Sequence, residues 1–219
     1  MRPDFYVLSW SDLLVSLFFI AFSLFLIKKW KLGLENTLLI GSLRTFVQLT
    51  LMGYVLTWFF DQQHWAFMLM LLLIMILIAS YEGTRRQKNS IPHFFPAMLV
   101  ALLSSAIIIL GTILLFILDV EPWYSPYAAI PIGGMIIGNG LNSTALTANR
   151  FVGELKHREK EIETLLALGA TPKLAVFDAM KTSIHAALIP NINAMMTVGL
   201  VQLPGVMTGQ ILAGIDPII

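Results

Sequence analysis

The chain has 219 residues, of which 57% are hydrophobic, and its mean hydropathy is +0.79. Charged residues make up 12%, about half the share of an average soluble domain. A soluble fold of this size would therefore leave much apolar surface in water. The formal net charge of +1 argues against a nucleic-acid partner. The absence of cysteine excludes disulfides and thiolate metal sites. We expect membrane lipid to surround the chain.

Apolar stretches recur at the length that a membrane-spanning helix needs, roughly 20 residues. The sequence thus predicts an all-α polytopic membrane protein with a single transmembrane domain over residues 1–219. The six predicted spans lie near residues 7–27, 37–60, 65–81, 94–118, 127–148 and 185–201. The N-terminal stretch has one basic residue, Arg2, and no small-residue cleavage pattern. We therefore expect a retained first span rather than a signal peptide.

Basic residues gather in alternate loops. They follow the first, third and fifth predicted spans: Lys28, Lys29, Lys31, Arg85, Arg86, Lys88, Arg150, Lys156, Arg158, Lys160, Lys173 and Lys181. The loops on the opposite side read "DQQH" and "DVEPWYSP" and carry acid without base. Because cytoplasmic loops carry the excess of Lys and Arg, this pattern predicts an outside N-terminus and three cytoplasmic loops.

One charge lies inside the second predicted span. Arg44 and Gln48 are four residues apart and share a helix face. A charge at membrane depth is costly and suggests a functional site. Arg44 also lies near the cytoplasmic end of its span, where Glu82 of the third span is the expected ionic partner. A structural Arg44–Glu82 pair is the favoured interpretation, and a direct substrate contact is the alternative.

The fifth predicted span is rich in small and polar residues. Gly134 and Gly138 form a G-x-x-x-G pair that permits close helix contact. Asn139, Asn142 and Ser143 lie on one helix face. Polar groups at this depth need partners on other helices or a water-filled cavity. These residues therefore favour either interhelical hydrogen bonds or a transport path.

The segment 150–182 interrupts the apolar chain with charge. We expect a helix over residues 152–168, in which Glu154 and Arg158 form a favourable i,i+4 pair. Gly169 then occupies the position of a left-handed cap, and Thr171 with Pro172 supplies an N-cap and first-turn proline for a second helix. The pattern predicts helix, elbow, helix. It is either a docking element or a solvated connector.

The chain after the elbow contains the sixth span and an apolar terminus. Asn191 and Asn193 of this span could likewise either form interhelical hydrogen bonds or line a transport path. Pro190 is a natural kink point. The stretch "LPGVMTGQILAG" is too short to span and too apolar for a plain loop. We expect a re-entrant or broken helix that gates the outer mouth through Pro204, Gly205 and Gly209. Alternatively, a final span is missing from this chain.

Several longer motifs resemble one known family. They are "LRTFVQLTLMGYVL", "GMIIGNGLNSTALTANRF", "ETLLALGAT" and "NINAMMTVGLVQLPGVMTGQILAG". "ETLLALGAT" is similar to the cytoplasmic coupling segment of ABC transporter membrane subunits. Together the motifs resemble the FetB family of ABC-type iron-export permeases, which includes the membrane subunits of plant aluminium-tolerance transporters. Members of that family usually continue into a further apolar span after "TGQILAG".

The resemblance implies a transport subunit without its own ATPase site, and no G-x-x-x-x-G-K-[ST] motif occurs. A separate P-loop ATPase subunit would bind ATP and Mg and dock on the coupling segment: Glu161, Glu163, Leu166, Gly169, Ala170 and Thr171. The resemblance further implies a homodimer in the bacterial inner membrane that exports iron, another metal ion or a small solute. No cofactor is expected on this chain, and its histidines and methionines form no trusted metal-ligand spacing. An ion-gradient-driven secondary transporter is the alternative, whereas an intramembrane enzyme is disfavoured because its motifs are missing.

Overall fold

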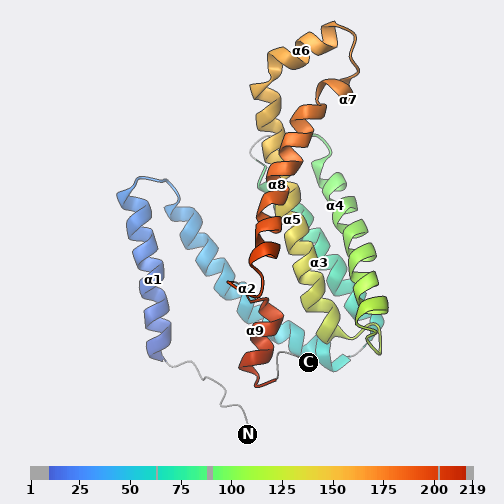
Figure 1. Ribbon diagram of the computed structural model, residues 1–219. Helices are drawn as coiled ribbons and strands as arrows, with labels where there is room; N and C mark the ends of the chain where they lie inside the picture. Colours follow the sequence, from blue (N-terminus) through green and yellow to red (C-terminus); the bar gives the residue numbers. More distant parts are fainter. Residues whose placement is uncertain (1–9, 63, 88–90, 202, 216–219) are drawn as a thin grey trace. The chain divides into compact units, whose positions relative to one another are not determined.

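The computed structural model describes residues 10–62, 64–87, 91–201 and 203–215, and the elements in these ranges are helices. The chain divides into two compact units. The first contains the described parts of Met1–Asp61 and Gly205–Ile219, and the second contains those of Gln62–Pro204. Figure 1 shows the helices of each unit in sequence colours. The predicted start of the first span, at residue 7, lies outside the described residues.

The first unit consists of two long helices and one short helix: α1 (Trp10–Lys29), α2 (Glu35–Gln62) and α9 (Gly205–Leu212). A short turn joins α1 to α2, and in it Lys31 and Gly33 adopt φ angles of 52° and 67°. None of the most apolar window of α2 is buried within the chain. Because α2 is apolar on most of its faces, this exposure fits a helix surrounded by lipid.

The second unit is built around α5 (Pro126–His157), the longest helix of the described residues. It contacts α3 (Trp65–Arg85), α4 (Phe94–Ser105) and α8 (Phe177–Thr197). The helix expected over residues 94–118 is present, but beyond Ser105 it continues as two π-helical segments, η1 (Ala106–Leu110) and η2 (Ile113–Ile117). Two short helices, α6 (Glu159–Ala167) and α7 (Pro172–Ala175), join α5 to α8.

Large apolar side chains form the core between α3, α4 and α5. The buried members include Met68, Leu72, Ile76, Met98, Leu102 and Leu110. Glycines let the helices approach closely: a Cβ on Gly133 would lie 2.7 Å from Leu72 Cδ2, and one on Gly140 would lie 2.8 Å from Leu102 Cδ2. A Cβ on Gly138 would meet nothing within 4 Å. The closest approaches of the α5 glycines therefore lie at Gly133 and Gly140. Of the expected pair, Gly134 would place a Cβ 3.4 Å from Met75 Cε, whereas Gly138 makes no such contact within this chain.

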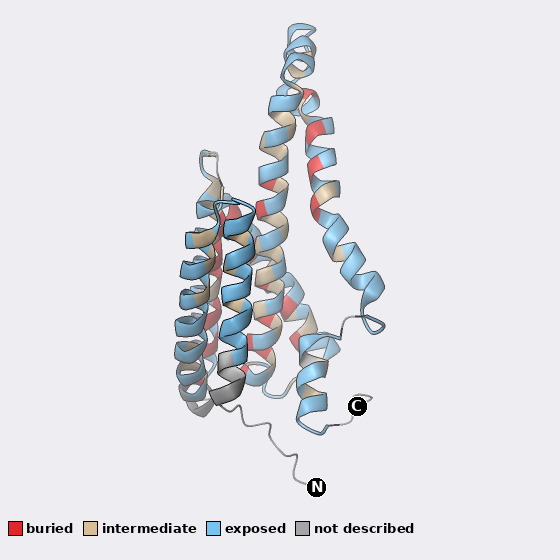
Figure 2. Cartoon of the chain, turned by 90° about the vertical axis from the view of Figure 1, so that its left-hand side faces the viewer, coloured by how far each residue is buried: buried red, intermediate tan, exposed pale blue. Residues whose placement is uncertain are grey.

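The outward faces of these helices are also apolar. Figure 2 shows buried residues as limited patches on some of the helices and most of the remaining surface as exposed. Ile107 and Phe116 are among the exposed large side chains. Among the residues that the structure describes, three helical stretches are long and apolar enough to cross a membrane: Glu35–Thr57, Trp65–Arg85 and Phe94–Ile117. Such a surface requires an apolar environment.

Candidate functional site

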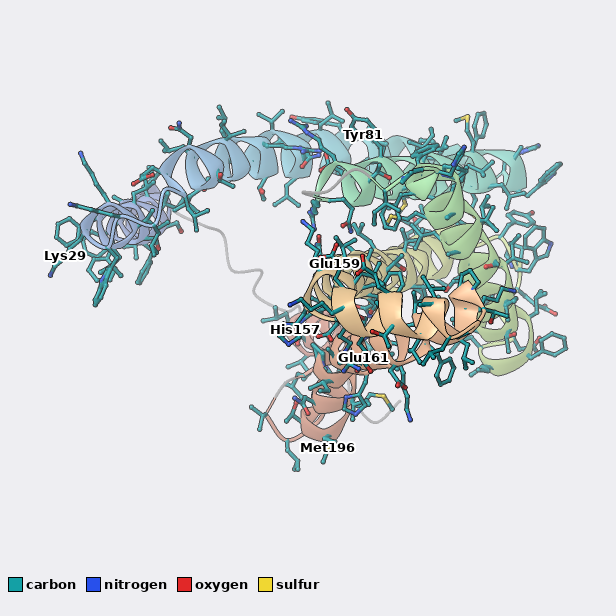
Figure 3. The ribbon with its side chains drawn as sticks, turned by 90° about the horizontal axis from the view of Figure 1, so that it is seen from above. Lys29, Tyr81, His157, Glu159, Glu161 and Met196 are labelled. Atoms are coloured by element: carbon teal, nitrogen blue, oxygen red, sulfur yellow. The ribbon has the colours of Figure 1, made fainter. Side chains whose placement is uncertain are left out.

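The charged segment forms the tip of a helical hairpin. Helices α5 and α8 pack side by side, and α6 lies across their end (Figure 1). Figure 3 looks down on this tip and labels His157 at the end of α5 and Glu159 and Glu161 at the start of α6. No residue of α6 is buried. The segment is therefore displayed by the hairpin rather than packed into its core.

The elbow after α6 closes in the way the sequence predicts. Gly169 has a φ of 91°. Its N–H donates to the Leu166 carbonyl at 3.0 Å, and the Ala170 N–H donates to the Leu165 carbonyl at 3.0 Å. These two bonds define a Schellman motif with glycine at the left-handed position. The Thr171 hydroxyl then accepts from the Leu174 N–H at 3.4 Å, and Pro172 opens α7. The predicted left-handed cap and N-cap are confirmed.

The prediction of one continuous helix over residues 152–168 is wrong, because α5 ends at His157 and α6 begins at Glu159. The chain breaks at Arg158, whose φ and ψ are −103° and 20°. The Arg158 N–H still donates to the Glu154 carbonyl, and the Arg158 carbonyl still accepts from the Ile162 N–H. The break is therefore confined to one residue and turns α6 away from the axis of α5. A second break at Val176 separates α7 from α8.

The surface of α6 combines charge with exposed leucine. Arg158 Nε lies 3.2 Å from Glu154 Oε2, which confirms the expected pair, and Arg158 Nη1 lies 3.9 Å from Glu161 Oε2. Both pairs lie partly open to solvent, and surface pairs of this kind add little stability. Leu166 is 42% exposed and Leu168 is 79% exposed. Apolar side chains held out by a charged helix are typical of a surface that meets a partner.

Small residues hold α8 against α5. Ala179, Ser183 and Ala187 are buried and recur every fourth residue on α8. Helix α8 packs along α5, on which Ala145 and Ala148 are also buried. Such small-residue spacing lets helix backbones approach closely where lipid removes the usual hydrophobic driving force. This stripe was not among the sequence-based predictions, although its four-residue period is a signal that could have revealed it.

One of the four candidate path amides lies at this helix contact. Asn191 Nδ2 donates to Ser143 Oγ at 2.8 Å, and both side chains are partly buried. Asn139 and Asn142 of α5 are exposed within the chain, as is Asn193 of α8. The structure therefore links Asn191 of α8 to α5 by a hydrogen bond to Ser143. It does not gather the four amides into one site within a single chain. Their role in transport stays a prediction.

The Ser143–Asn191 contact gives a first expected result. Ser143→Ala and Asn191→Ala should each lower the stability of the protein in detergent modestly, because interhelical hydrogen bonds in membranes are worth about 0.6 kcal/mol on average. The double variant should lose less than the two single losses added together. Thermal unfolding of the four proteins measures this coupling. Strictly additive losses would mean that the bond does not contribute.

Two other predictions concern the Arg44–Glu82 ion pair and the outer gate. Arg44 belongs to the first unit and Glu82 to the second, so their pairing stays a prediction. The terminal segment forms the short helix α9, which begins at Gly205 directly after Pro204 and contains Gly209. That this segment is a re-entrant or broken helix, and that it acts as an outer gate, both stay predictions. Within the described residues, no three His, Asp or Glu side chains are grouped as metal ligands.

One polar contact between helices had no signal in the sequence. Gln87 Nε2, just beyond α3, donates to the Ala145 carbonyl of α5 at 3.1 Å. It fastens the end of α3 to the middle of α5. A glutamine after a helix has many possible partners, so its sequence position alone does not indicate this bond.

The apolar helices and their exposed faces define a polytopic helical membrane protein. Residues 10–219 match the model of the family described as "Uncharacterised protein family (UPF0014)", and the chain belongs to that family. The chain is 39% identical to "UPF0014 membrane protein YjkA" of Bacillus subtilis (strain 168), over 94% of this chain and 81% of the relative.

Two further relatives carry names that refer to metals. The chain is 34% identical to "Probable iron export permease protein FetB" of Escherichia coli (strain K12), over 94% of this chain and 78% of the relative. It is also 34% identical to "Protein ALUMINUM SENSITIVE 3" of Arabidopsis thaliana, over 85% of this chain and 67% of the relative. The family resemblance inferred from the motifs is thus confirmed. No solved structure matches the chain.

Proposed function

We propose that the chain is the membrane permease subunit of an ATP-driven ABC exporter. The observation that carries this proposal is the displayed tip of the α5–α8 hairpin, where a charged helix with exposed leucines ends in a glycine elbow. A solvated connector would need the paired charges, but it would not need exposed Leu166 and Leu168 beside a Schellman-capped elbow.

In this proposal, a separate P-loop ATPase subunit docks on Glu161, Glu163, Leu166, Gly169, Ala170 and Thr171. ATP and Mg bind to that partner. Two copies of the present chain form the transporter, most simply as a homodimer. Closure of the two ATPase subunits pushes each elbow, and the small-residue contact between α5 and α8 carries the displacement into the membrane. Six spans with an outside N-terminus in the bacterial inner membrane complete this arrangement.

The names of two relatives support a proposal for the substrate class. The E. coli relative is named a probable iron export permease, and the Arabidopsis relative is named for aluminium sensitivity. We therefore propose iron, another metal ion or a small solute as the exported species. It would pass along the amide-bearing faces of α5 and α8, near Asn139, Asn142, Asn191 and Asn193.

Replacement of the path amides tests the transport role. Asn139→Leu and Asn193→Leu should lower transport several-fold in the reconstituted two-component complex, because an apolar side chain removes the polar surface that a charged or polar substrate needs. Capture of the ATPase subunit and thermal stability should stay close to wild type, since both side chains are exposed within the chain. ATPase stimulation by iron, by other metal ions and by small solutes identifies the exported species.

A matched pair of substitutions separates path from scaffold. Asn149 is also exposed on α5 but lies outside the proposed path, so Asn149→Leu should keep its transport rate. If Asn139→Leu and Asn193→Leu are well folded, bind the ATPase and transport at the wild-type rate, these faces do not form the path.

A further inference from the structure

An apolar groove runs between the two long helices of the first unit. It has a volume of about 660 Å³ and lies open along one side. Its walls include Ile20 and Ile27 of α1, Leu34 of the turn, and Leu38, Gly41 and Phe46 of α2. Almost all of the exposed lining is hydrocarbon. A groove of this volume and composition suits an acyl chain.

One end of the groove lies at a basic turn. Ile27 and Leu34, which line the groove, directly flank the turn that carries Lys28, Lys29 and Lys31. All three lysines are exposed, and none of them forms an ion pair with a carboxylate in the described part of the chain. Glu35 is the single acidic residue between positions 26 and 40. The mouth of the groove is therefore positively charged.

Two backbone hydrogen bonds fix the conformation of the turn between α1 and α2. The Lys31 N–H donates to the Lys28 carbonyl at 3.2 Å, and the Leu32 N–H donates to the Ile27 carbonyl at 3.1 Å. These bonds cap α1 with Lys31 at the left-handed position, at a φ of 52°. Trp30 is 72% exposed beside them, as expected of an aromatic residue at a membrane interface. Lys29 is labelled at this end of α1 in Figure 3.

From this juxtaposition we propose that the α1–α2 groove binds an anionic phospholipid. One acyl chain lies against Ile20, Ile27, Leu38 and Gly41, and the negatively charged headgroup binds to Lys28, Lys29 and Lys31. A second copy of this chain is a poorer occupant. A two-fold axis along the membrane normal would bring the same three lysines of both copies to one level, where like charges repel. This inference does not depend on the proposed transport function.

Native mass spectrometry of the full chain in mild detergent tests the proposal. The protein is incubated with equal amounts of phosphatidylglycerol and phosphatidylcholine that carry the same acyl chains. Wild type should retain more phosphatidylglycerol. Lys28→Gln/Lys29→Gln/Lys31→Gln should reduce that preference on the order of a hundredfold, because each of the three lysines near an anionic surface contributes about fivefold. Lys160→Gln/Lys173→Gln/Lys181→Gln, with the same change in net charge, should keep it.

A glycine pair on α2 tests the groove separately. A Cβ at Gly41 or at Gly53 would meet nothing within 4 Å, but only Gly41 is among the groove-lining residues. Gly41→Leu should therefore fill the groove and lower retention of both lipids, whereas Gly53→Leu should behave as wild type. Size-exclusion chromatography of the same proteins reports their oligomeric state.

Three results would overturn the inference. The first is equal lipid retention in Gly41→Leu and Gly53→Leu. The second is an equal loss of preference in the two triple-lysine variants, which would indicate net charge alone. The third is a Gly41→Leu variant that keeps its lipid but changes its oligomeric state, which would make a helix of a second copy the occupant. Should the lysine variant fail to fold, the glycine pair still decides the question.

Discussion

Gly169→Val is expected to weaken capture of the ATPase subunit by about tenfold. Gly169 closes the Schellman motif after α6 at a φ of 91°, and left-handed backbone costs a residue with a side chain on the order of 1–2 kcal/mol. A β-branched residue is particularly unsuited to this conformation. The elbow would settle into another conformation, and docking would have to restore the original one. A cost of about 1.4 kcal/mol corresponds to about a tenfold loss of affinity.

The matched control is Gly153→Val. Gly153 lies within α5, in ordinary helical conformation, and a Cβ there would also meet nothing within 4 Å. The two variants thus make the same chemical change with the same free space, and they differ in the required backbone conformation. Pull-down of the purified ATPase subunit compares them, with Glu163→Lys as a charge reversal on exposed α6. If Gly169→Val and Glu163→Lys both bind as well as wild type, the segment is not the docking site.

Gly133→Val should destabilise the protein more than a replacement on an exposed helix face. Its first side-chain atom would lie 2.7 Å from Leu72 Cδ2 and 3.4 Å from Leu110 Cδ2. Both leucines are buried in the core between α3, α4 and α5, so neither can move without displacing its neighbours. Overpacking a core in this way costs about 1–3 kcal/mol. The Tm of the detergent-solubilised protein should fall accordingly.

Gly138→Val on the same helix isolates the packing effect. Both substitutions replace a helical glycine and gain the same intrinsic helix propensity, but a Cβ at Gly138 meets open space within the chain. Its Tm should therefore equal or exceed that of wild type. A Tm for Gly133→Val that matches the Gly138→Val value would mean that the close approach of α3 and α5 is not needed for stability.

Much of the membrane architecture is encoded locally and follows from the sequence. The length and hydropathy of the apolar stretches predict long helices, and α2, α3 and α5 begin within two residues of the predicted starts. The elbow is equally local. A glycine that follows a helix and a Thr-Pro pair that precedes one have preferences that act within a single turn of chain, and both occur as expected at Gly169 and Thr171.

Only the tertiary structure decided which small and polar residues meet. The sequence offered Gly134 with Gly138 as the contact pair, yet the closest approaches lie at Gly133 and Gly140, and of the offered pair only Gly134 has a neighbour near its would-be Cβ, Met75 Cε at 3.4 Å. Adjacent residues differ by about 100° around a helix axis, so the identity of the contact depends on how α5 is rotated against α3 and α4. The same holds for Asn191, which donates to Ser143, and for Asn193, which is exposed two residues later. Composition places amides in α5 and α8, but the rotation of one helix against the other determines which of them pair.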